Sequence, residues 1–447
     1  MSGTMRVRDS LLAICLVLAI VLAACANPAP AVTTPTAPPA AAPQSQPAAS
    51  AAPAFKVGLA LPLSGPYSGY GLDVVHGLQF AIEEVNNAGG IKGLGGAKIE
   101  LVQADSLDPD VNACQTAFES LVNKEQVNFV IGSISQTCNG QMASLAEKYQ
   151  IPTMGIAGAL YQKDFPWFVN LGSQPAVHAL NNVNRTLDIA QEYKLPINRI
   201  AVMSAPAIGG GYQLELGTEA LKQRGLDKNV VETITLDLSA TDLSAQALKL
   251  KAANPDVLIT SLIGPQFTAG IKAFYSVGFD PPIWGDTNQF PTDPSTIKAV
   301  GEDVWRSVIM KPGRIYNGFY DHPDLKIKSV EAYRTRSAAW LKEHNYRQND
   351  FTTFGSQGGY VLAKLLNDTK TRDKATLNRA LRQLRIPMDD PNFVQAYYRP
   401  EIGWKTSSET LHADTVTIQP QEKDGNVQQV LLYPKEYRPA GVTFWHR

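Results

Sequence analysis

FKVGLALPLSGPYSGYGLDVVHGLQFAIEEVNNAGG, residues 55–90, holds one complete strand–loop–helix unit. Its apolar start is typical of a buried strand, and 71–90 has the apolar spacing of a helix that ends at two glycines. The loop between them, LPLSGPYSGYG at 61–71, occupies the position where many α/β proteins hold a ligand. Its glycines are not spaced as G-x-G-x-x-G and no Gly-Lys-Ser/Thr follows, so the loop carries neither nucleotide-phosphate motif.

The same alternation of apolar strands and amphipathic helices continues along the chain. Further strands are predicted at 97–105, 128–133, 151–156, 199–205, 230–236, 256–262 and 282–286. Helix-like stretches such as 112–125 and 267–279 lie between them. This pattern predicts an α/β fold in which helices cover both faces of parallel sheets. The body from residue 54 onward is too long for one ordinary core, so we expect two lobes.

The N-terminus has the features of an export signal. Two arginines precede an apolar run, 11–22, that suits a signal-peptide core and is too short to span a membrane. The run ends in Leu-Ala-Ala-Cys, 22–25, which resembles the lipobox of bacterial lipoproteins. The resemblance implies a lipoprotein signal peptide at 1–24 and a lipid on Cys25. The alternative is an ordinary secretory signal with an incidental cysteine.

Residues 25–53 are expected to form a lipidated tether and not a domain. After Cys25 the segment consists almost entirely of Ala, Pro, Thr, Ser and Gln. Such a composition builds no core and favours extended, polyproline-like conformations. The expected location is therefore extracytoplasmic, anchored to the bacterial cell membrane on its periplasmic or outer face.

The folded body contains two cysteines, Cys114 and Cys138. In an oxidising compartment we expect them to form one disulfide, and the alternative is two buried thiols. Their spacing fits neither C-x-x-C nor a zinc site, so we expect no metal and no cofactor. The formal net charge is −1 and no basic run occurs, which removes the electrostatic basis for binding nucleic acid.

The motifs of several common enzyme classes are missing from the sequence. None of the six histidines lies in H-E-x-x-H, and no G-x-S-x-G nucleophile elbow occurs. Asp105 and Asp108 have the spacing of an acid–base pair, but Asp108-Pro109 before a predicted helix is more simply a cap and turn. We therefore expect a binding protein and not an enzyme.

Polar loops, three of which contain glycine, follow the predicted strands at the edge where parallel sheets bind ligands. These loops are 61–71, 133–137, 157–160, 205–212 and 286–290. Their tyrosines, Tyr70 and Tyr212 included, offer apolar area and one hydroxyl each. Any one loop could be a tight strand–helix turn, whereas five at corresponding positions favour a cleft for a small polar molecule.

Several motifs occur in the order found in one known family. They are PLSGPYSGYG (62–71), VNNAGGIKG (85–93), ADSLDPDVNA (104–113), FVIGS (129–133), DVLITSLIGPQFTAGIKAFYSVGF (256–279) and MKPG (310–313). From residue 55 to about residue 370 the chain resembles the substrate-binding proteins of branched-chain amino-acid-type (leucine/isoleucine/valine-binding) ABC importers, here in lipoprotein form. These are type I periplasmic binding proteins.

The resemblance implies two Rossmann-like lobes joined by a three-stranded hinge. The first lobe would comprise 54–173 plus 311–390, and the second 174–310 plus 391–447. A monomer would capture a small polar molecule by hinge closure and deliver it to the ABC permease subunits. The alternative is a ligand-binding sensor lipoprotein of the same fold, which would pass its ligand to a signalling partner.

The resemblance also implies the ligand site, with several departures from the family pattern. Tyr70 takes the place of the family's cleft tyrosine. Gln136 and Ala159 stand where relatives have hydroxyl side chains, and Thr287 stands where relatives have the acidic partner of the ligand ammonium. Ile263 replaces an aromatic residue. The complete expected site is Tyr70, Ser133, Ser135, Gln136, Thr137, Ala157, Gly158, Ala159, Tyr212, Ile263, Asp286 and Thr287.

These departures bear on the ligand class. A buried ammonium without a carboxylate partner costs several kcal/mol. If Asp286 reaches the site, a branched-chain amino acid can bind. If it does not, a small amide, an organic acid or an aromatic compound fits better.

Overall fold

The computed structural model describes residues 52–157, 164–172, 175–204, 212–237, 240–262, 264–287, 291–319, 322–394, 401–406 and 415–446. All of them belong to one compact unit, 51–447. The predicted signal peptide, Cys25 with its predicted lipid and nearly the whole predicted tether lie outside the described residues.

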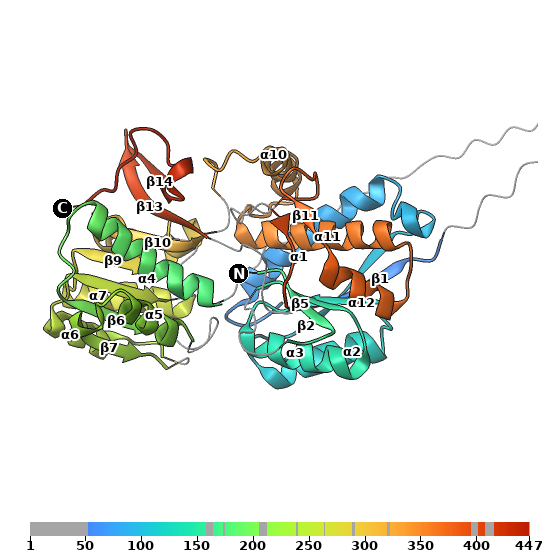
Figure 1. Ribbon diagram of the computed structural model, residues 1–447, viewed down its shortest axis with the longest axis horizontal. Coiled ribbons are helices and arrows are strands. Elements are labelled where there is room, and N and C mark those ends of the chain that lie inside the picture. The colour runs from blue at the N-terminus through green and yellow to red at the C-terminus, as the bar shows by residue number, and fades with distance from the viewer. Residues whose placement is uncertain are drawn as a thin grey trace, which may run out of the picture. The chain divides into compact units, whose positions relative to one another are not determined.

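The first sheet has five parallel strands among the described residues, in the order β2-β1-β3-β4-β5 (Figure 1). They are β1 (Phe55–Leu61), β2 (Ile99–Asp105), β3 (Phe129–Gly132), β4 (Thr153–Gly155) and β5 (Phe168–Asn170). In β3 and β4 every residue is buried, because helices cover both faces of the sheet.

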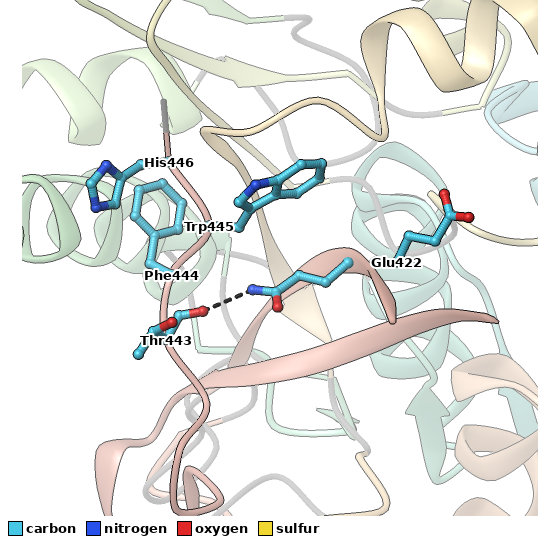
Figure 2. Close-up of a pocket in the computed structure, with 6 residues that line it drawn as sticks. Glu422, Thr443, Phe444, Trp445 and His446 are labelled. Carbon is cyan, nitrogen blue, oxygen red and sulfur yellow. Dashed lines mark hydrogen bonds between the residues drawn. The ribbon is translucent and has the colours of Figure 1, made fainter. Parts of the chain in front are cut away.

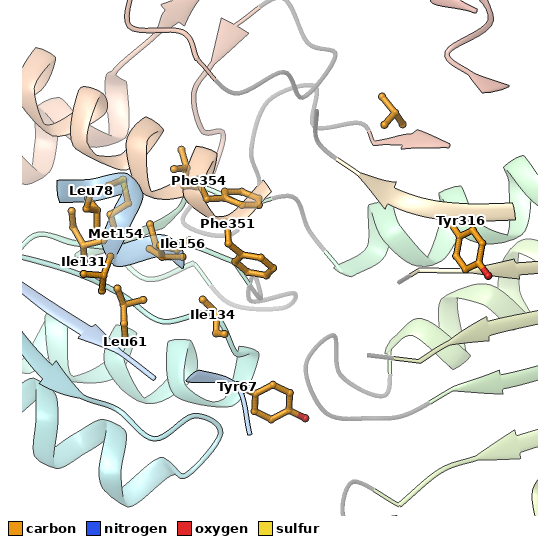
Figure 3. Packing of buried hydrophobic residues seen from close by; sticks show 14 of the residues in the cluster. Leu61, Tyr67, Leu78, Ile131, Ile134, Met154, Ile156, Tyr316, Phe351 and Phe354 are labelled. Atoms are coloured by element: carbon orange, nitrogen blue, oxygen red, sulfur yellow. The ribbon is translucent and has the colours of Figure 1, made fainter. Parts of the chain in front are cut away.

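Helices of the first lobe come from both halves of the chain. They are α1 (Ser68–Asn87), α2 (Val111–Asn123), α3 (Gln136–Tyr149), α10 (Lys328–Glu343), α11 (Asp350–Thr369) and α12 (Lys374–Gln383), with the short 3-10 helix η1 (Lys92–Leu94). On one face of the sheet, Phe118 of α2 and Met142 of α3 share a buried cluster with Val130 of β3. The cluster that contains Leu61 of β1, Leu78 of α1 and Phe354 of α11 is shown in Figure 3.

Two glycines let α1 and α11 approach each other closely. A Cβ on Gly77 would collide with the backbone carbonyl of Thr352, and a Cβ on Gly355 would collide with that of Val74. The helices therefore require glycine at these positions to pack as they do. This packing brings the N-terminal end of α11 beside α1, next to the loop that follows β1.

The second sheet has seven strands among the described residues, in the order β14-β13-β10-β9-β8-β6-β7. They are β6 (Ile200–Ser204), β7 (Val230–Thr235), β8 (Val257–Ser261), β9 (Ile283–Asp286), β10 (Arg314–Phe319), β13 (Val416–Lys423) and β14 (Asn426–Tyr433). The strands from β6 to β10 are parallel, and the β13–β14 hairpin adds an antiparallel edge beside β10 (Figure 1).

The elements around the second sheet are shorter on average. The helices are α4 (Pro175–Glu192), α5 (Tyr212–Gln223), α6 (Ser244–Ala253), α7 (Pro265–Val277), α8 (Pro294–Val300) and α9 (Glu302–Val308). Two 3-10 helices, η2 (Asp227–Asn229) and η3 (Lys435–Tyr437), follow α5 and β14. Each predicted strand of the sequence analysis coincides with an observed one.

The described strands change lobe three times along the chain, but the three-stranded hinge stays a prediction, because residues 173–174, 320–321 and 407–414 at these changes lie outside the described residues. The crossings follow β5, follow β10 and precede β13. β10 corrects the predicted boundary: residues 314–319 were expected in the first lobe but pair with β9 and β13 of the second sheet. The residues of a short strand do not indicate which sheet it joins, because sheet membership depends on the strands with which it pairs.

A second correction concerns the segment after residue 391, which was expected in the second lobe. β11 (Ile386–Pro387) pairs with β12 (Glu401–Ile402), and the indole N–H of Trp404 donates to the Asn170 carbonyl of β5. Residues 401–404 therefore belong with the first lobe.

Candidate functional site

The loop between β1 and α1 is held in shape by a carboxylate from the neighbouring strand. Asp105, the last residue of β2, accepts hydrogen bonds from the Leu63 N–H (2.9 Å) and the Ser64 hydroxyl (2.5 Å). Burial tends to raise the pKa of Asp105, but these hydrogen bonds outweigh it and the pKa lies below its usual value. Asp105 thus has a structural role in the cleft loop, and it is not paired with Asp108 for acid–base chemistry.

Three aromatic rings from two segments line the end of the first lobe. Tyr70 stacks on Phe351 of α11 with ring centroids 4.9 Å apart, and Tyr67 lies 6.4 Å from Tyr70. Figure 3 shows Tyr67 and Phe351 beyond the ends of the strands, with Ile156 next to Phe351. Burial raises the pKa of both tyrosines, so both hydroxyls stay neutral near pH 7. The three side chains form an aromatic surface that is largely buried in this structure, since Tyr67 is 9% and Phe351 8% exposed.

The loop after β8 meets this aromatic surface from the second lobe. Gly264 has φ +59°, and a Cβ placed on it would lie 3.9 Å from the Tyr70 hydroxyl oxygen. The predicted cleft residue Tyr70 therefore lies where loops of both lobes converge.

The loop after β3 is organised around Asp108, which is almost fully buried. Its carboxylate accepts from the Ser106 hydroxyl (2.5 Å), the Ser133 hydroxyl and the backbone N–H groups of Ile134 and Ser135 (3.1 Å each). Burial raises the pKa of Asp108, although the hydrogen bonds from Ser106 and Ser133 act in the opposite direction.

The hydroxyl residues predicted to hold ligand are engaged within this loop. Ser133 donates to Asp108, and Ser135 caps α3 by accepting from the Cys138 N–H (3.3 Å). Both serines are buried, whereas Thr137 is exposed with its hydroxyl 3.4 Å from the Pro109 carbonyl. The buried Oε1 atom of Gln136 has no hydrogen-bond partner among the described residues.

Cys114 of α2 and Cys138 of α3 are joined by a disulfide. Their sulfur atoms lie close to the Asp108 carboxylate, and such a trio could in principle hold a metal ion. The disulfide removes both thiolates that the metal would need, so the trio is not a metal site. The bond ties the Ser133–Thr137 loop to α2.

In the second lobe, Asp286 and Thr287 lie at the end of β9 and are both buried. Asp286 accepts a hydrogen bond from the Thr260 hydroxyl, which in turn accepts from the Trp284 indole N–H at 2.8 Å. The Thr287 hydroxyl donates to Ser261 at 2.9 Å. Asp286 is 0% exposed, and its carboxylate is engaged by Thr260 of the neighbouring strand β8.

Next to Asp286 is the ring of Tyr316, which is also fully buried. Burial raises the pKa of Tyr316; the Arg314 guanidinium acts in the opposite direction, and the Asp286 carboxylate adds to the increase. The Tyr316 hydroxyl has no hydrogen-bond partner within the described ranges.

A polar network of α4 lies beside the ends of β6 and β8. Asn182 donates to the Thr260 carbonyl (2.5 Å) and accepts from Asn317 (3.0 Å). A cavity of about 10 Å³, enough for one water molecule, opens between Asn182 and Ser204. Burial lowers the pKa of His178, on the same helix, to about 4, so its imidazole is neutral at physiological pH.

Several predicted site residues lie outside what the structure describes. Gly158, Ala159 and Ile263 are among them, and so is the side chain of Tyr212, whose backbone begins α5. Ala157 is described: its carbonyl accepts from Asn170 at 3.0 Å, which fixes the strand end. Sequence reasoning missed Phe351 and Thr260, because a helix residue and a mid-strand threonine carry no local sign of a ligand site.

A larger open pocket of about 260 Å³ lies away from the strand ends, at the C-terminal tail (Figure 2). It is lined by Gln421, Glu422, Thr443, Phe444, Trp445 and His446. The Gln421 side chain donates to the Thr443 carbonyl at 2.8 Å, and this hydrogen bond holds the tail against β13. No helix among the described residues is long and apolar enough to cross a membrane.

Comparisons with known proteins agree with this two-lobed geometry. The family model described as "Periplasmic binding protein" matches residues 54–405. The Leu/Ile/Val-binding protein homolog 7 of Brucella abortus (strain 2308) is 25% identical over 363 residues, which cover 76% of this chain and 84% of that protein.

Solved structures share the fold at lower identity. A leucine-binding protein from Thermotoga maritima is 17% identical with a TM-score of 0.66, covering 86% of this chain and 99% of that one. A solute-binding protein of an ABC transporter from R. palustris, in complex with 4-hydroxybenzoate, is 16% identical with a TM-score of 0.65. The match covers 85% of this chain and 96% of that one.

Proposed function

Because the chain belongs to the periplasmic binding protein family, whose members bind solutes and are not enzymes, we propose that it is the solute-binding component of an ABC importer. Its ligand is a small organic acid or amide with an apolar or aromatic body, captured between the two lobes by hinge closure. The closed, loaded form is what the permease subunits would recognise.

The burial of Asp286 carries the choice of ligand class. An α-amino acid brings an ammonium group that needs an accessible carboxylate in the cleft. Asp286 is the acidic residue nearest the family position, but it is 0% exposed and accepts from Thr260 inside the lobe. A ligand without an ammonium group avoids this unmet requirement.

The aromatic surface supports the same choice. Tyr67, Tyr70 and Phe351 contribute three apolar rings, and the hydroxyls of the two tyrosines are neutral, which suits a flat or aliphatic ligand body. Among proteins of this fold, one structure holds 4-hydroxybenzoate and another, from Streptococcus pneumoniae, holds isoleucine. The fold therefore accommodates both aromatic acids and amino acids, and the side chains of this chain favour a ligand of the aromatic-acid kind.

The proposal includes the anchor. The Leu-Ala-Ala-Cys sequence at 22–25 and the Pro-rich segment after it support a lipoprotein held outside the cytoplasm on Cys25. Labelling with a radioactive or clickable fatty acid in the native cell, with Cys25→Ala as control, tests this part separately.

A thermal-shift panel on unfolded and refolded protein tests the ligand class. A ligand at one hundred times its Kd should add about 2.7 kcal/mol to the free energy of unfolding. We expect a shift with benzoate-type acids, aliphatic acids or amides, retained in Asp286→Asn because Asn can still accept from Thr260. A shift with leucine, isoleucine or valine that Asp286→Asn abolishes would overturn the ligand class and leave the importer proposal intact.

A further inference from the structure

Arg347 lies in the connection between α10 and α11 and is anchored to the first lobe. One terminal nitrogen of its guanidinium donates to Asp73 Oδ2 of α1 at 2.6 Å. Asn349 donates to the same oxygen, also at 2.6 Å. The Asp73 side chain is 5% exposed, so this pair is largely shielded from solvent.

Asn349 fixes the position of this anchor. It forms a capping box at the start of α11: its side chain accepts from the Phe351 N–H (2.9 Å), and its N–H donates to the Thr352 hydroxyl (2.7 Å). Because α11 packs against α1 through Gly77, the capping box and Asp73 belong to one rigid part of the first lobe.

The second terminal nitrogen of Arg347 reaches the other lobe. It lies 3.3 and 3.4 Å from the two carboxylate oxygens of Asp293, and 3.4 Å from the Ser295 hydroxyl. Asp293 is the N-cap of α8, where it accepts from the Ser295 N–H at 2.7 Å. α8 packs beside α7 and α9 of the second lobe.

We propose that Arg347 is an electrostatic latch between the lobes. Its planar guanidinium offers separate donors to two carboxylates, one from each lobe. When the hinge opens, the Asp73 contact stays intact within the first lobe while the Asp293 contact must break. The latch therefore favours the closed arrangement before any ligand binds.

The consequence for binding rests on the proposed function, since it requires that ligand binds the closed form. The apparent affinity of such a protein scales with the population of its competent state. The Arg347 side chain is 43% exposed, and an ion pair with this exposure contributes about a two- to fivefold change in an equilibrium. The latch should thus tighten apparent binding by that factor at low salt.

Asp293→Asn is the variant that tests the latch. Asparagine caps a helix as well as aspartate does, so α8 should remain intact while the charge disappears. Glu422→Gln is the matched control: the Glu422–Arg306 pair is 3.4 Å long with side chains 47% and 49% exposed, but both partners belong to the second lobe.

The measurement is single-molecule energy transfer on ligand-free full-length protein, labelled at Lys124→Cys and Lys228→Cys, one exposed position on each lobe. We expect Asp293→Asn and 0.5 M salt each to lower the closed fraction two- to fivefold, and Glu422→Gln to leave it unchanged. An unchanged closed fraction in Asp293→Asn, or an equal loss in Glu422→Gln, would overturn the proposal. The measurement needs no ligand, so failure of the latch proposal can be distinguished from failure of the importer proposal.

Discussion

Gly264, at the N-cap of α7 in the second lobe, lies against the ring of Tyr67 from the first: a Cβ built on Gly264 would come within 3.3 Å of Tyr67 Cε1. The φ of +59° strains any other residue at this position, and the contact with the ring is tighter than an ordinary van der Waals contact. A side chain at 264 would therefore press on the loop of the first lobe.

Gly264→Ala should weaken ligand binding as well as stability. The new methyl presses on Tyr67 only when the lobes meet, and a penalty of about 1 kcal/mol on closure is about fivefold in apparent affinity. Gly278→Ala is the control, since Gly278 also has positive φ (+63°) at the other end of α7 and its Cβ would meet only the Lys251 ammonium, at 3.8 Å. Calorimetric titration measures the ligand affinity of both variants. Equal affinities in Gly264→Ala and Gly278→Ala would show that the Tyr67 contact plays no part in closure.

Asp108→Asn and Asp108→Ala should differ strongly in the free energy of unfolding. Asparagine keeps an acceptor for Ser133, Ile134 and Ser135 without a buried charge, so we expect a change within about 1 kcal/mol. Alanine leaves those donors buried and unpaired, which costs about 2–4 kcal/mol. Urea unfolding at pH 7 measures both.

The pH dependence of Asp108 provides an independent check. Its folded pKa is raised by burial, so its contribution to stability is present in full below the unfolded pKa of about 3.8 and is lost as pH rises through the folded pKa. Asp108→Asn should remove this slope. A loss in Asp108→Asn as large as in Asp108→Ala would mean that the charge itself stabilises the loop.

His178 should make the protein less stable in mild acid. Its folded pKa is lowered to about 4, below the unfolded value of about 6.5, so the unfolded chain binds the proton first. Stability is therefore full above pH 6.5 and falls as pH drops toward 4, by about 2–3 kcal/mol. In His178→Gln the midpoint of unfolding should change less with pH across this window than it does in the wild type. An equal pH dependence in the two proteins would assign the effect to other groups.

Removing the disulfide should destabilise the first lobe. Cys114 and Cys138 are 24 residues apart, and opening a loop of this length costs about 3 kcal/mol. We expect the Cys114→Ala/Cys138→Ala protein to unfold at a lower urea concentration than the wild type. The wild-type protein in reductant should unfold at the same urea concentration as this variant. A difference below about 1 kcal/mol would show that the reduced chain keeps α2 and α3 together without the bond.

Much of the fold was predictable because its signals are local. The apolar runs and glycine-bounded helices of residues 55–286 gave strands and helices at the predicted places, and the order of motifs gave the family. The loop after β1 was placed at the converging strand ends on the same grounds. Periodicity, turn chemistry and strand–helix alternation are properties of neighbouring residues, so a single sequence contains them.

Patterns of neighbouring residues were enough to predict the α/β class, the two lobes and the likeness to solute-binding proteins. The folded chain was needed to show that β10 joins the second sheet, that Asp286 accepts a hydrogen bond from Thr260, and that Arg347 pairs with Asp73, which is 274 positions away along the chain. Such contacts depend on which surfaces the packed lobes bring together. No pattern of adjacent residues specifies them, because a side chain finds its partner only after the backbone is folded.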